Sequence, residues 1–279
     1  MCGRYAASAN LDDVVEEFDV EVDRRDEPTR SILVSPQSPP PGSPDWNMAP
    51  TKQAPVIVTR ADRRTASADP VRQLRLLTWG LVPNWAKSPR VGARMINARA
   101  EEILGKPSFT RALAARRALV PAAGWYEWQV SPTAVDAPGK PRKQPFFLAR
   151  ADGATLAMAG IYEFWRDRRV RDTEDPMAWL VTFAVLTTAA EPGLDRIHDR
   201  QPLILDKADW GRWLDPNLTS PGDIGDLLGY AAPGRFTAYP VSRAVSSNHN
   251  NGPQLLDPAD PAELIGVLDP TTGEIIGTG

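Results

Sequence analysis

The sequence feature that most constrains the fold is a series of short apolar runs separated by polar turns. The longest run, "AWLVTFAVLTTAA" at residues 178–190, is continuously apolar apart from its threonines. A run of this length and composition predicts a central strand that is buried on both faces. Further strands are predicted at 54–60, 74–82, 118–130, 145–150, 155–165 and 236–242.

The predicted helices are short and lie between these strands. They cover about 11–18 with Asn10 as the N-cap, a segment that begins near Ser108, 206–214 with Asp206 as the cap, and 223–231. Dominant strands with scattered short helices predict an α+β fold, with a curved, antiparallel or mixed sheet that closes on itself like a barrel. The sequence lacks βαβ alternation and a Gly-rich phosphate loop, so a Rossmann or P-loop fold has little support.

Three segments break the strand pattern. Residues 28–45, which include "SPQSPPPGSP", are rich in Pro and Ser and predict a loop. Residues 131–144 also predict a loop, and 257–279 form an acidic tail with weak structural signals. We expect a single compact domain over 1–256, with the 28–45 loop inside it and the tail after it.

Composition narrows the class of protein. The chain has no apolar run long enough for a membrane span and no secretory h-region, and a single Cys excludes an internal disulfide. We therefore expect a cytoplasmic protein. One Cys and two His make a structural zinc site improbable, and we expect neither a metal nor an organic cofactor.

The charge distribution is uneven although the net charge is only −3. Residues 86–117 hold eight Lys or Arg and two Glu, whereas 252–279 hold five acidic residues and no basic one. A basic stretch of this kind is typical of polyanion binding, but it also occurs on a solvated helix and loop face. Charge alone leaves both interpretations open.

The only cysteine, Cys2, follows Met1, which is normally removed when the next residue is small. Removal would leave an α-amine with a pKa of about 7.7–8.0 beside a thiol near 8.5. An aldehyde could then form an imine with the amine and a thiazolidine ring with the adjacent thiol. An amide or ester could instead be attacked by the thiol with the amine as base, so Cys2 supports two enzyme classes.

Two further segments place polar side chains in extended, partly apolar contexts. In "MINARAEE", Asn97 and Arg99 share one side of an extended segment, and they could hold a sugar oxygen and a phosphate. In "GWYEW", period two puts Glu127 on the same face as Trp125, where an apolar wall would raise its pKa. An exposed strand Glu remains the alternative.

The other candidates lie in loops. His198, in "IHDRQP", is either a proton carrier or a capping or core His, and Arg200 beside it could orient it or contact phosphate. Arg243 lies in the polar loop after the last predicted strand and could also contact phosphate. Trp85, in "TWGLVPNWAKSP", leads into the basic stretch, where an exposed Trp could stack on a base or simply fill the core.

Together, in this order, these motifs resemble the SRAP (SOS response-associated peptidase) family. Its members are abasic-site processing proteins that crosslink to DNA. The matching stretches run from residue 1 to about 256. They are "MCGRYA", "WNMAPT", "WGLVPNW", "INARAE", "GWYEW", "QPFF", "IHDRQPLIL" and "YPVSRAV".

The resemblance implies a role for each candidate residue. Cys2 would be the nucleophile that forms the thiazolidine, Asn97 would contact the abasic sugar, Glu127 would assist proton transfer, and His198 would help to open the sugar and to stabilise or reverse the linkage. Arg4, Arg99 and Trp85 fall where the family binds the DNA backbone and wedges a base.

The resemblance further implies a compact α+β domain with a basic groove for single-stranded DNA. We therefore expect a monomeric protein that captures abasic sites in single-stranded DNA, with a possible lyase side activity and self-removal of Met1. Two alternatives remain: an N-terminal-nucleophile glutamine amidotransferase, which also starts "MCG", and a passive single-strand binding module in which Cys2 is incidental.

Overall fold

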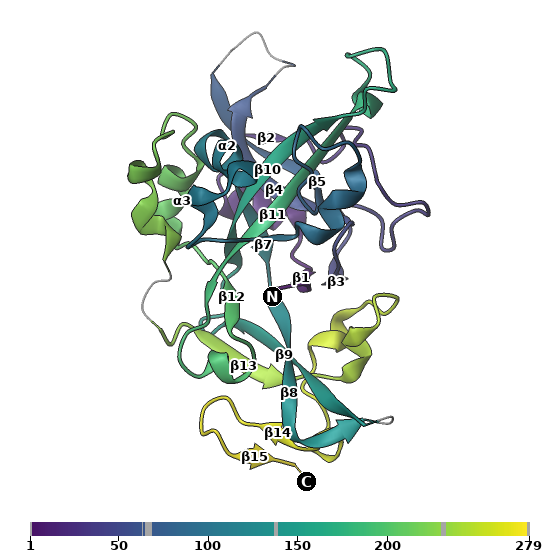
Figure 1. Cartoon of the computed structure of the whole chain (residues 1–279), viewed down its shortest axis with the longest axis vertical. Coiled ribbons are helices and arrows are strands. Elements are labelled where there is room, and N and C mark those ends of the chain that lie inside the picture. The colour runs from purple at the N-terminus through teal and green to yellow at the C-terminus, as the bar shows by residue number, and fades with distance from the viewer. Residues whose placement is uncertain (1, 63, 65–68, 137–138, 230–232, 278–279) are drawn as a thin grey trace.

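The computed structural model describes residues 2–62, 64, 69–136, 139–229 and 233–277. Figure 1 shows an upper body of strands with helices along its side and a smaller sheet below it. β1 and β3 lie where the two parts meet.

Five strands of the upper body form a closed barrel. Antiparallel pairing runs in the order β11-β10-β7-β4-β5, and a parallel pairing of Thr182 with Thr78 joins β11 back to β5. This closure confirms the barrel-like, mixed sheet that the sequence predicts. The barrel strands are β4 (Gln53–Ala61), β5 (Pro70–Trp79), β7 (Arg117–Ala122), β10 (Leu156–Arg166) and β11 (Trp179–Ala189).

Alternation along these strands sorts side chains between two apolar clusters. The interior of the barrel is filled by alternate residues such as Val58, Val120 and Met158. The intervening residues face outward and pack beneath the helices, which bury large side chains such as Trp213. Burying a smaller member of the same cluster, such as Phe18, stabilises the fold by roughly 1.5–3 kcal/mol. The helices are α1 (Leu11–Glu17), α2 (Pro107–Ala115) and α3 (Lys207–Leu214).

Local sequence explains where these helices begin. The Asn10 side chain accepts a hydrogen bond from the Asp12 backbone N–H at 2.9 Å, which caps α1 as predicted. Pro107 occupies the first turn of α2, where no backbone donor is needed. Asp206 is the N-cap residue of α3, but its carboxylate pairs with Arg235 and makes no capping bond.

The second sheet lies below the barrel in Figure 1 and has the strand order β13-β9-β8-β1-β3. Its strands are β1 (Tyr5–Ala7), β3 (Asp45–Met48), β8 (Gly124–Asp136), β9 (Lys140–Arg150) and β13 (Phe236–Pro240). β7 leads almost directly into β8, so the chain passes from the barrel into this sheet at Ala123. This junction brings β1 and the residues before it beside the end of the barrel.

The remaining described elements are short. The strands are β2 (Val22–Asp23), β6 (Asn97–Arg99), β12 (Arg200–Pro202), β14 (Val267–Leu268) and β15 (Ile275–Ile276). The 3-10 turns are η1 (Pro89–Arg94), η2 (Ile103–Gly105), η3 (Pro176–Ala178), η4 (Leu194–Arg196), η5 (Pro221–Asp223), η6 (Gly225–Leu228), η7 (Arg243–Ser246), η8 (Pro253–Leu256) and η9 (Pro261–Glu263).

Two secondary-structure predictions are wrong. The segment 131–144 is not a loop, because β8 and β9 continue as a paired hairpin to Asp136 and Lys140. The segment 223–231 is not an α-helix but 3-10 turns, since Gly225 and Gly229 weaken helix formation, and its last two residues lie outside the described ones. The 28–45 loop is irregular up to β3, as predicted.

The acidic tail has more structure than its sequence indicates. β14 and β15 pair with each other, and the Gln129 side chain bonds both the N–H and the carbonyl of Leu268. Leu264 and Val267 are buried in the cluster that also fills the barrel. The tail therefore docks against β8. Among the helices that the structure describes, none has the length and apolar character that a membrane-spanning segment needs.

Candidate active site

Cys2 lies at the junction of the barrel and the second sheet. Its side chain is completely buried and packs in the apolar cluster that contains Tyr5 and Trp125. Burial, followed by the nearby Glu127 carboxylate, raises the pKa of the Cys2 thiol well above its ordinary value. The thiol is thus protonated at neutral pH and has an acid–base group close by.

Asn97 reaches Cys2 directly. Its Nδ2 donates a hydrogen bond of 2.7 Å to the Cys2 carbonyl oxygen. Its Oδ1 is buried and accepts no hydrogen bond from the described residues. Because Nδ2 is held by Cys2 while Oδ1 has no donor among the described residues, Oδ1 can accept a hydrogen bond from a bound molecule.

The position of Asn97 follows from two close backbone approaches. β6 pairs in parallel with β11, with Asn97 opposite Val185. Upstream, Gly80 has φ +124°, and a Cβ there would lie 2.6 Å from the Gly92 carbonyl oxygen. Only glycine permits this approach, which holds η1 against the end of β5. The chain after η1 then runs into β6, where Asn97 lies next to Cys2.

Glu127 lies on β8 with only 4% of its surface exposed. Burial raises the pKa of its carboxyl group to about 7, and the Asp199 carboxylate adds to this shift. The neighbouring residues Tyr126 and Trp128 pack on the opposite face of β8, in a separate cluster. The shared face of Trp125 and Glu127 and the raised pKa are as the sequence predicts.

His198 sits in the turn between η4 and β12. Its Nδ1 accepts a hydrogen bond of 3.0 Å from the Arg200 backbone N–H and lies 3.0 Å from Asp199 Oδ1. Burial lowers the pKa of His198, and Asp199 acts in the opposite direction. The neutral ring therefore carries its proton on Nε2 while Nδ1 accepts, and a protonated ring would face the Asp199 carboxylate.

These residues come from four separate parts of the chain. Asn97 bonds Cys2, the Glu127 carboxylate interacts electrostatically with both Cys2 and Asp199, and Ile197 packs in the same apolar cluster as Cys2. The structure thus gathers β6, β8 and the His198 turn around residue 2. Met1 itself lies outside the described residues.

Arg4 is held firmly beside this site. Its Nη1 donates to Asn47 Oδ1 at 2.6 Å and to the Val245 carbonyl oxygen at 3.0 Å. Its guanidinium carbon lies 5.9 Å from the centre of the Trp128 ring. Burial lowers the pKa of Arg4, and Asp45 acts in the opposite direction.

Two of the predicted DNA contacts are well exposed. The Trp85 surface is 67% exposed, so this residue does not fill the core. Arg99 projects from β6 and pairs with Glu102 at 3.0 Å. It lines a cavity of about 220 Å³ that also includes Asn97, Lys106 and Phe109. Glu102 also lines it and pairs with Lys106 as well, so the hollow next to Asn97 holds two cations, one carboxylate and an aromatic ring.

Arg200 and Arg243 are engaged within the protein. Arg200 donates to both Glu101 oxygens at 2.9 and 2.8 Å and to the Thr187 carbonyl at 2.6 Å. Arg243 forms a forked pair with Asp136. The Arg200 side chain joins β12 to the segment that contains Glu101, and the Arg243 side chain joins η7 to β8. Contact of these two arginines with DNA stays a prediction.

Sequence reasoning missed Asn47, which organises the wall of the site. Its Nδ2 donates to three carbonyl groups of the 245–250 loop while its Oδ1 accepts from Arg4. The nearby Lys52 and Asp45 form a buried ion pair at 2.7 Å. The "WNMAPT" motif was the available signal, but it carries no hint of its partners 200 residues away. Among the described residues, no three His, Cys, Asp or Glu side chains lie close enough together to hold a metal ion.

The chain is similar to several curated proteins over nearly its whole length. It is 32% identical to the abasic site processing protein YoaM of Bacillus subtilis, covering 92% of this chain and 98% of that protein. It is 30% identical to the abasic site processing protein YedK of Escherichia coli, covering 92% and 100%. The abasic site processing protein HMCES of Rattus norvegicus is 28% identical over 78% of this chain and 65% of its own length.

Solved structures support the fold. A protein from Bacteroides thetaiotaomicron superposes with a TM-score of 0.66 at 24% identity and covers 92% of this chain and 100% of its own. A phage-related protein from Bordetella bronchiseptica gives a TM-score of 0.56 at 28% identity, covering 87% and 95%. The family model described as SOS response associated peptidase (SRAP) matches residues 1–248. The chain is therefore a member of the SRAP family.

Proposed function

We propose that this protein processes abasic sites in single-stranded DNA and captures them covalently through Cys2 after Met1 has been removed. The observation that carries the proposal is the convergence on residue 2 of Asn97, through a 2.7 Å hydrogen bond, and of the buried Glu127 carboxyl. The relatives named abasic site processing proteins, which match along nearly the whole chain, give the substrate class.

The chemistry begins with the aldehyde of the ring-opened abasic sugar. The free α-amine of Cys2 attacks the carbonyl carbon, and loss of one water gives an imine. The sulfur then adds to the imine carbon, the C=N electron pair moves to nitrogen, and the thiol proton ends on that nitrogen. The product is a thiazolidine ring, and one water is released overall.

Burial sets the order of these steps. The raised pKa of the Cys2 thiol keeps it protonated, so the amine attacks first and the thiol closes the ring. Glu127, with a pKa of about 7, can give a proton to the departing hydroxyl and later take the thiol proton. The Asn97 Oδ1 would accept a hydrogen bond from a sugar hydroxyl.

His198 is placed to help open the sugar ring. Its lowered pKa keeps the imidazole neutral, with the proton on Nε2, and the Asp199 carboxylate would stabilise a protonated ring. Arg4, Arg99 and Trp85 would hold the DNA strand, with Arg99 on the cavity beside Asn97. The imine stage also permits β-elimination, which would appear as a lyase side activity.

The test is a denaturing gel with a single-stranded oligonucleotide that carries one abasic site. The wild-type protein should give a heat-stable adduct, and Cys2→Ala should give none. Cys2→Ser keeps the amine but has a weaker nucleophile, so its adduct should need borohydride reduction to survive heating. An oligonucleotide with a tetrahydrofuran site, which has no aldehyde, is the matched substrate control.

Two results would contradict the proposal. Equal heat-stable adduct with unreduced Cys2→Ala would show that the Cys2 thiol does not form the stable linkage. Equal heat-stable adduct with unreduced Cys2→Ser would show that the sulfur is not needed for the stable linkage, which would exclude the thiazolidine.

A further inference from the structure

The end of the barrel opposite Cys2 opens into a second hollow. This mouth, of about 600 Å³, is lined by Arg60 on β4, Arg75 on β5, Arg166 on β10, Arg116 just before β7 and Arg111 on α2. Its wall also contains Phe164 and Trp179. We call this hollow the arginine mouth.

Strand alternation explains why the arginines meet there. Arg60 lies an even number of residues from Val56 and Val58 on β4, so it shares the strand face that fills the barrel interior. Arg75 shares the inward face of β5 with Leu77 in the same way. Arg60 and Arg75 thus continue inward-facing rows beyond the point where apolar residues fill the barrel, and α2 adds Arg111 from the side. The rows converge, so the side chains share one opening.

The arginine mouth is far from the candidate active site. Asn97, which bonds Cys2, lies opposite Val185 on β11, and Val185 lies opposite Gly160 on β10. Arg166 lies six residues further along β10, and a rise of roughly 3.3 Å per residue puts about 20 Å between Gly160 and Arg166. A ligand in the arginine mouth would therefore not touch Cys2, Asn97 or Glu127.

The positive charge at this mouth is only partly neutralised. Arg75 pairs with Glu27, and Arg116 pairs with Glu163 at 2.7 Å. Among the described residues, no ion pair joins Arg60, Arg111 or Arg166 to a carboxylate. Glu174 also lines the hollow, but within the described part of the chain it is not paired with these three cations, which remain available to an anion.

Two observations indicate that the arginine mouth is a defined binding site and not only a patch of solvated surface charge. The Arg166 Nε is buried and has no hydrogen-bond partner among the described residues, while its Nη2 donates to the Val170 and Arg171 carbonyls. Burial and the neighbouring Arg60 cation lower the pKa of Arg75. Like charges crowded into a half-buried opening favour a bound anion.

Aromatic rings stand beside the cations. The Arg60 guanidinium carbon lies 4.9 Å from the centre of the Phe164 ring, and the half-buried Trp179 forms another part of the wall. Its Nε1 donates to the Thr173 carbonyl, which fixes the indole plane. Fixed rings next to forked cations suit a ligand that has both a flat ring and a phosphate.

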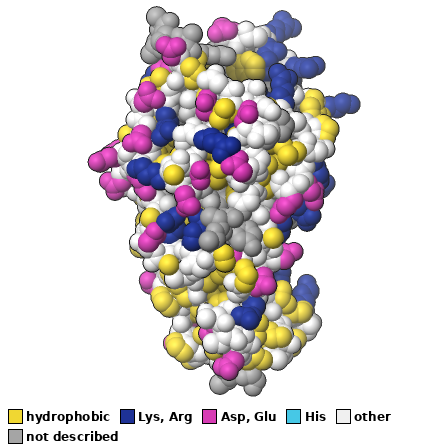
Figure 2. Space-filling view, turned by 90° about the vertical axis from the view of Figure 1, so that its left-hand side faces the viewer, with side chains coloured by type: hydrophobic (Ala, Val, Ile, Leu, Met, Phe, Trp, Pro, Cys, Tyr) yellow, Lys and Arg dark blue, Asp and Glu magenta, His cyan; other side chains and the backbone are white. Residues whose placement is uncertain are grey.

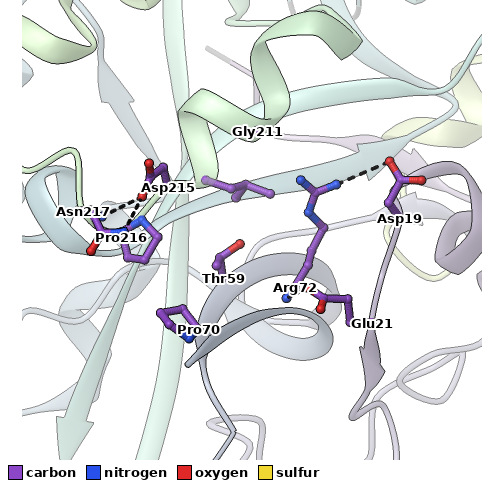
Figure 3. A pocket seen from close by; sticks show the side chains of 10 residues that line it. Asp19, Glu21, Thr59, Pro70, Arg72, Gly211, Asp215, Pro216 and Asn217 are labelled. Atoms are coloured by element: carbon purple, nitrogen blue, oxygen red, sulfur yellow. Dashed lines mark hydrogen bonds and ion pairs between the residues drawn. The ribbon is translucent and has the colours of Figure 1, made fainter. Parts of the chain in front are cut away.

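Another hollow of similar size has the opposite character. Figure 3 shows the cavity of about 540 Å³ between α3 and the start of β5, where Arg72 points toward Asp19 at 3.7 Å. Glu21 and Asp215 also line it, so acids outnumber the single arginine. The face that carries α3 likewise mixes acidic and basic side chains (Figure 2). The excess of arginines is therefore a property of the arginine mouth, not of every hollow on this protein.

We propose that the arginine mouth binds a mononucleotide, with its phosphate on Arg60, Arg111 and Arg166 and its base against Trp179. The nucleotide could be free or could be the phosphorylated end of a DNA strand. This inference is independent of covalent capture at Cys2.

The test is calorimetric titration of the full-length protein with 2′-deoxyadenosine 5′-monophosphate. We expect saturable binding, weaker binding of inorganic phosphate, and weaker binding of deoxyadenosine. Arg60→Gln and Arg166→Gln should each weaken binding about 10-fold, the usual effect of losing one charge-assisted hydrogen bond. Arg111→Gln, on the exposed face of α2, should act in the same direction without risk to folding. Arg212→Gln, which removes a charge on α3, is the matched control and should bind like wild type.

A 5′-phosphorylated oligonucleotide without abasic sites separates the two sources. Displacement of the mononucleotide by this strand, but not by its unphosphorylated form, assigns the arginine mouth to strand ends. No displacement assigns it to free nucleotides. Absence of saturable binding, or unchanged affinity in all three arginine variants, would overturn the proposal. The variants should still form the covalent adduct, so a failure here leaves the proposed function intact.

Discussion

At the end of the barrel that carries Cys2, the reacting thiol and the Glu127 carboxyl are buried, whereas at the arginine mouth the arginines Arg60, Arg111 and Arg166 keep part of their surface exposed. Burial is the leading cause of the shifted pKa values of Cys2, Glu127 and His198. At the mouth, Arg60 and Arg166 keep access to solvent. Desolvation prepares groups to exchange protons near neutral pH, while exposed cations prepare a surface to hold an anion.

One barrel can carry both the buried Cys2 end and the cationic arginine mouth. Inward-facing rows are apolar in the middle, so the two ends share a scaffold but no polar contact. Changes at one end should therefore leave the other unaffected. The predictions below test that separation.

The largest expected effect is on adduct formation by Glu127→Gln. Glutamine keeps the shape but cannot transfer protons, so the rate at pH 7 should fall at least ~100-fold. The wild-type rate should change with an apparent pKa of about 7, and this inflection should be absent from the variant. Mononucleotide binding should be unchanged. A variant within about threefold of wild type, with the same pH profile, would remove Glu127 from the mechanism.

The same substitution should stabilise the protein at high pH. The folded-state pKa of Glu127 is raised to about 7, so the folded chain holds this proton more tightly than the unfolded chain. The resulting stability is fully present below about pH 4.5 and is lost as pH rises through 7. At pH 8, Glu127→Gln should therefore be up to about 3 kcal/mol more stable in urea unfolding. A pH-independent difference between the two proteins would contradict the buried carboxyl.

Gly124→Ala should disturb the Cys2 end alone. A Cβ at Gly124 would lie 2.5 Å from the Leu148 carbonyl oxygen and would overlap the Phe147 ring. Overpacking of this kind costs about 1–3 kcal/mol and would shift β8, which carries Glu127. Gly105→Ala, where a Cβ meets no atom within 4 Å, is the control and should change stability by less than about 0.5 kcal/mol. Equal stability of the two variants in thermal unfolding would show that β8 can move away freely.

The smallest effect concerns two tryptophans. Trp85→Ala should weaken noncovalent binding of single-stranded DNA about 10-fold, the loss of one stacked base, when measured by fluorescence anisotropy. Trp179→Leu should leave that binding unchanged and weaken mononucleotide binding instead. If both substitutions weaken both ligands, the two ends belong to one continuous surface.

Three strands of the barrel were predictable because most of their residues are apolar. The runs at 54–60, 155–165 and 178–190 correspond to β4, β10 and β11. Composition misled at 131–144, where Pro, Gly and Lys indicate a loop but the two arms pair with each other across a solvent-exposed hairpin. Short β1 and β3 have no periodic signal, since three or four residues contain barely one repeat.

The candidate site was predictable residue by residue but not as an arrangement. Cys2, Asn97, Glu127 and His198 were identified from local chemistry and from the order of motifs. The hydrogen bond from Asn97 to residue 2 spans 95 positions, and the Asn47 network spans about 200. Such contacts depend on how the barrel and the second sheet meet, which no local pattern records. The arginine mouth was equally hidden, because its arginines are spread over residues 60–166 and meet only through the way the barrel strands and α2 pack.

The most direct test of covalent capture at the buried end is the intact mass of the protein before and after reaction with abasic single-stranded DNA. The free protein should lack Met1, and the product should weigh the sum of protein and oligonucleotide less one water. Fragmentation should place the DNA remnant on Cys2. A crosslinked protein that retains Met1, or a remnant on any other residue, would contradict the mechanism.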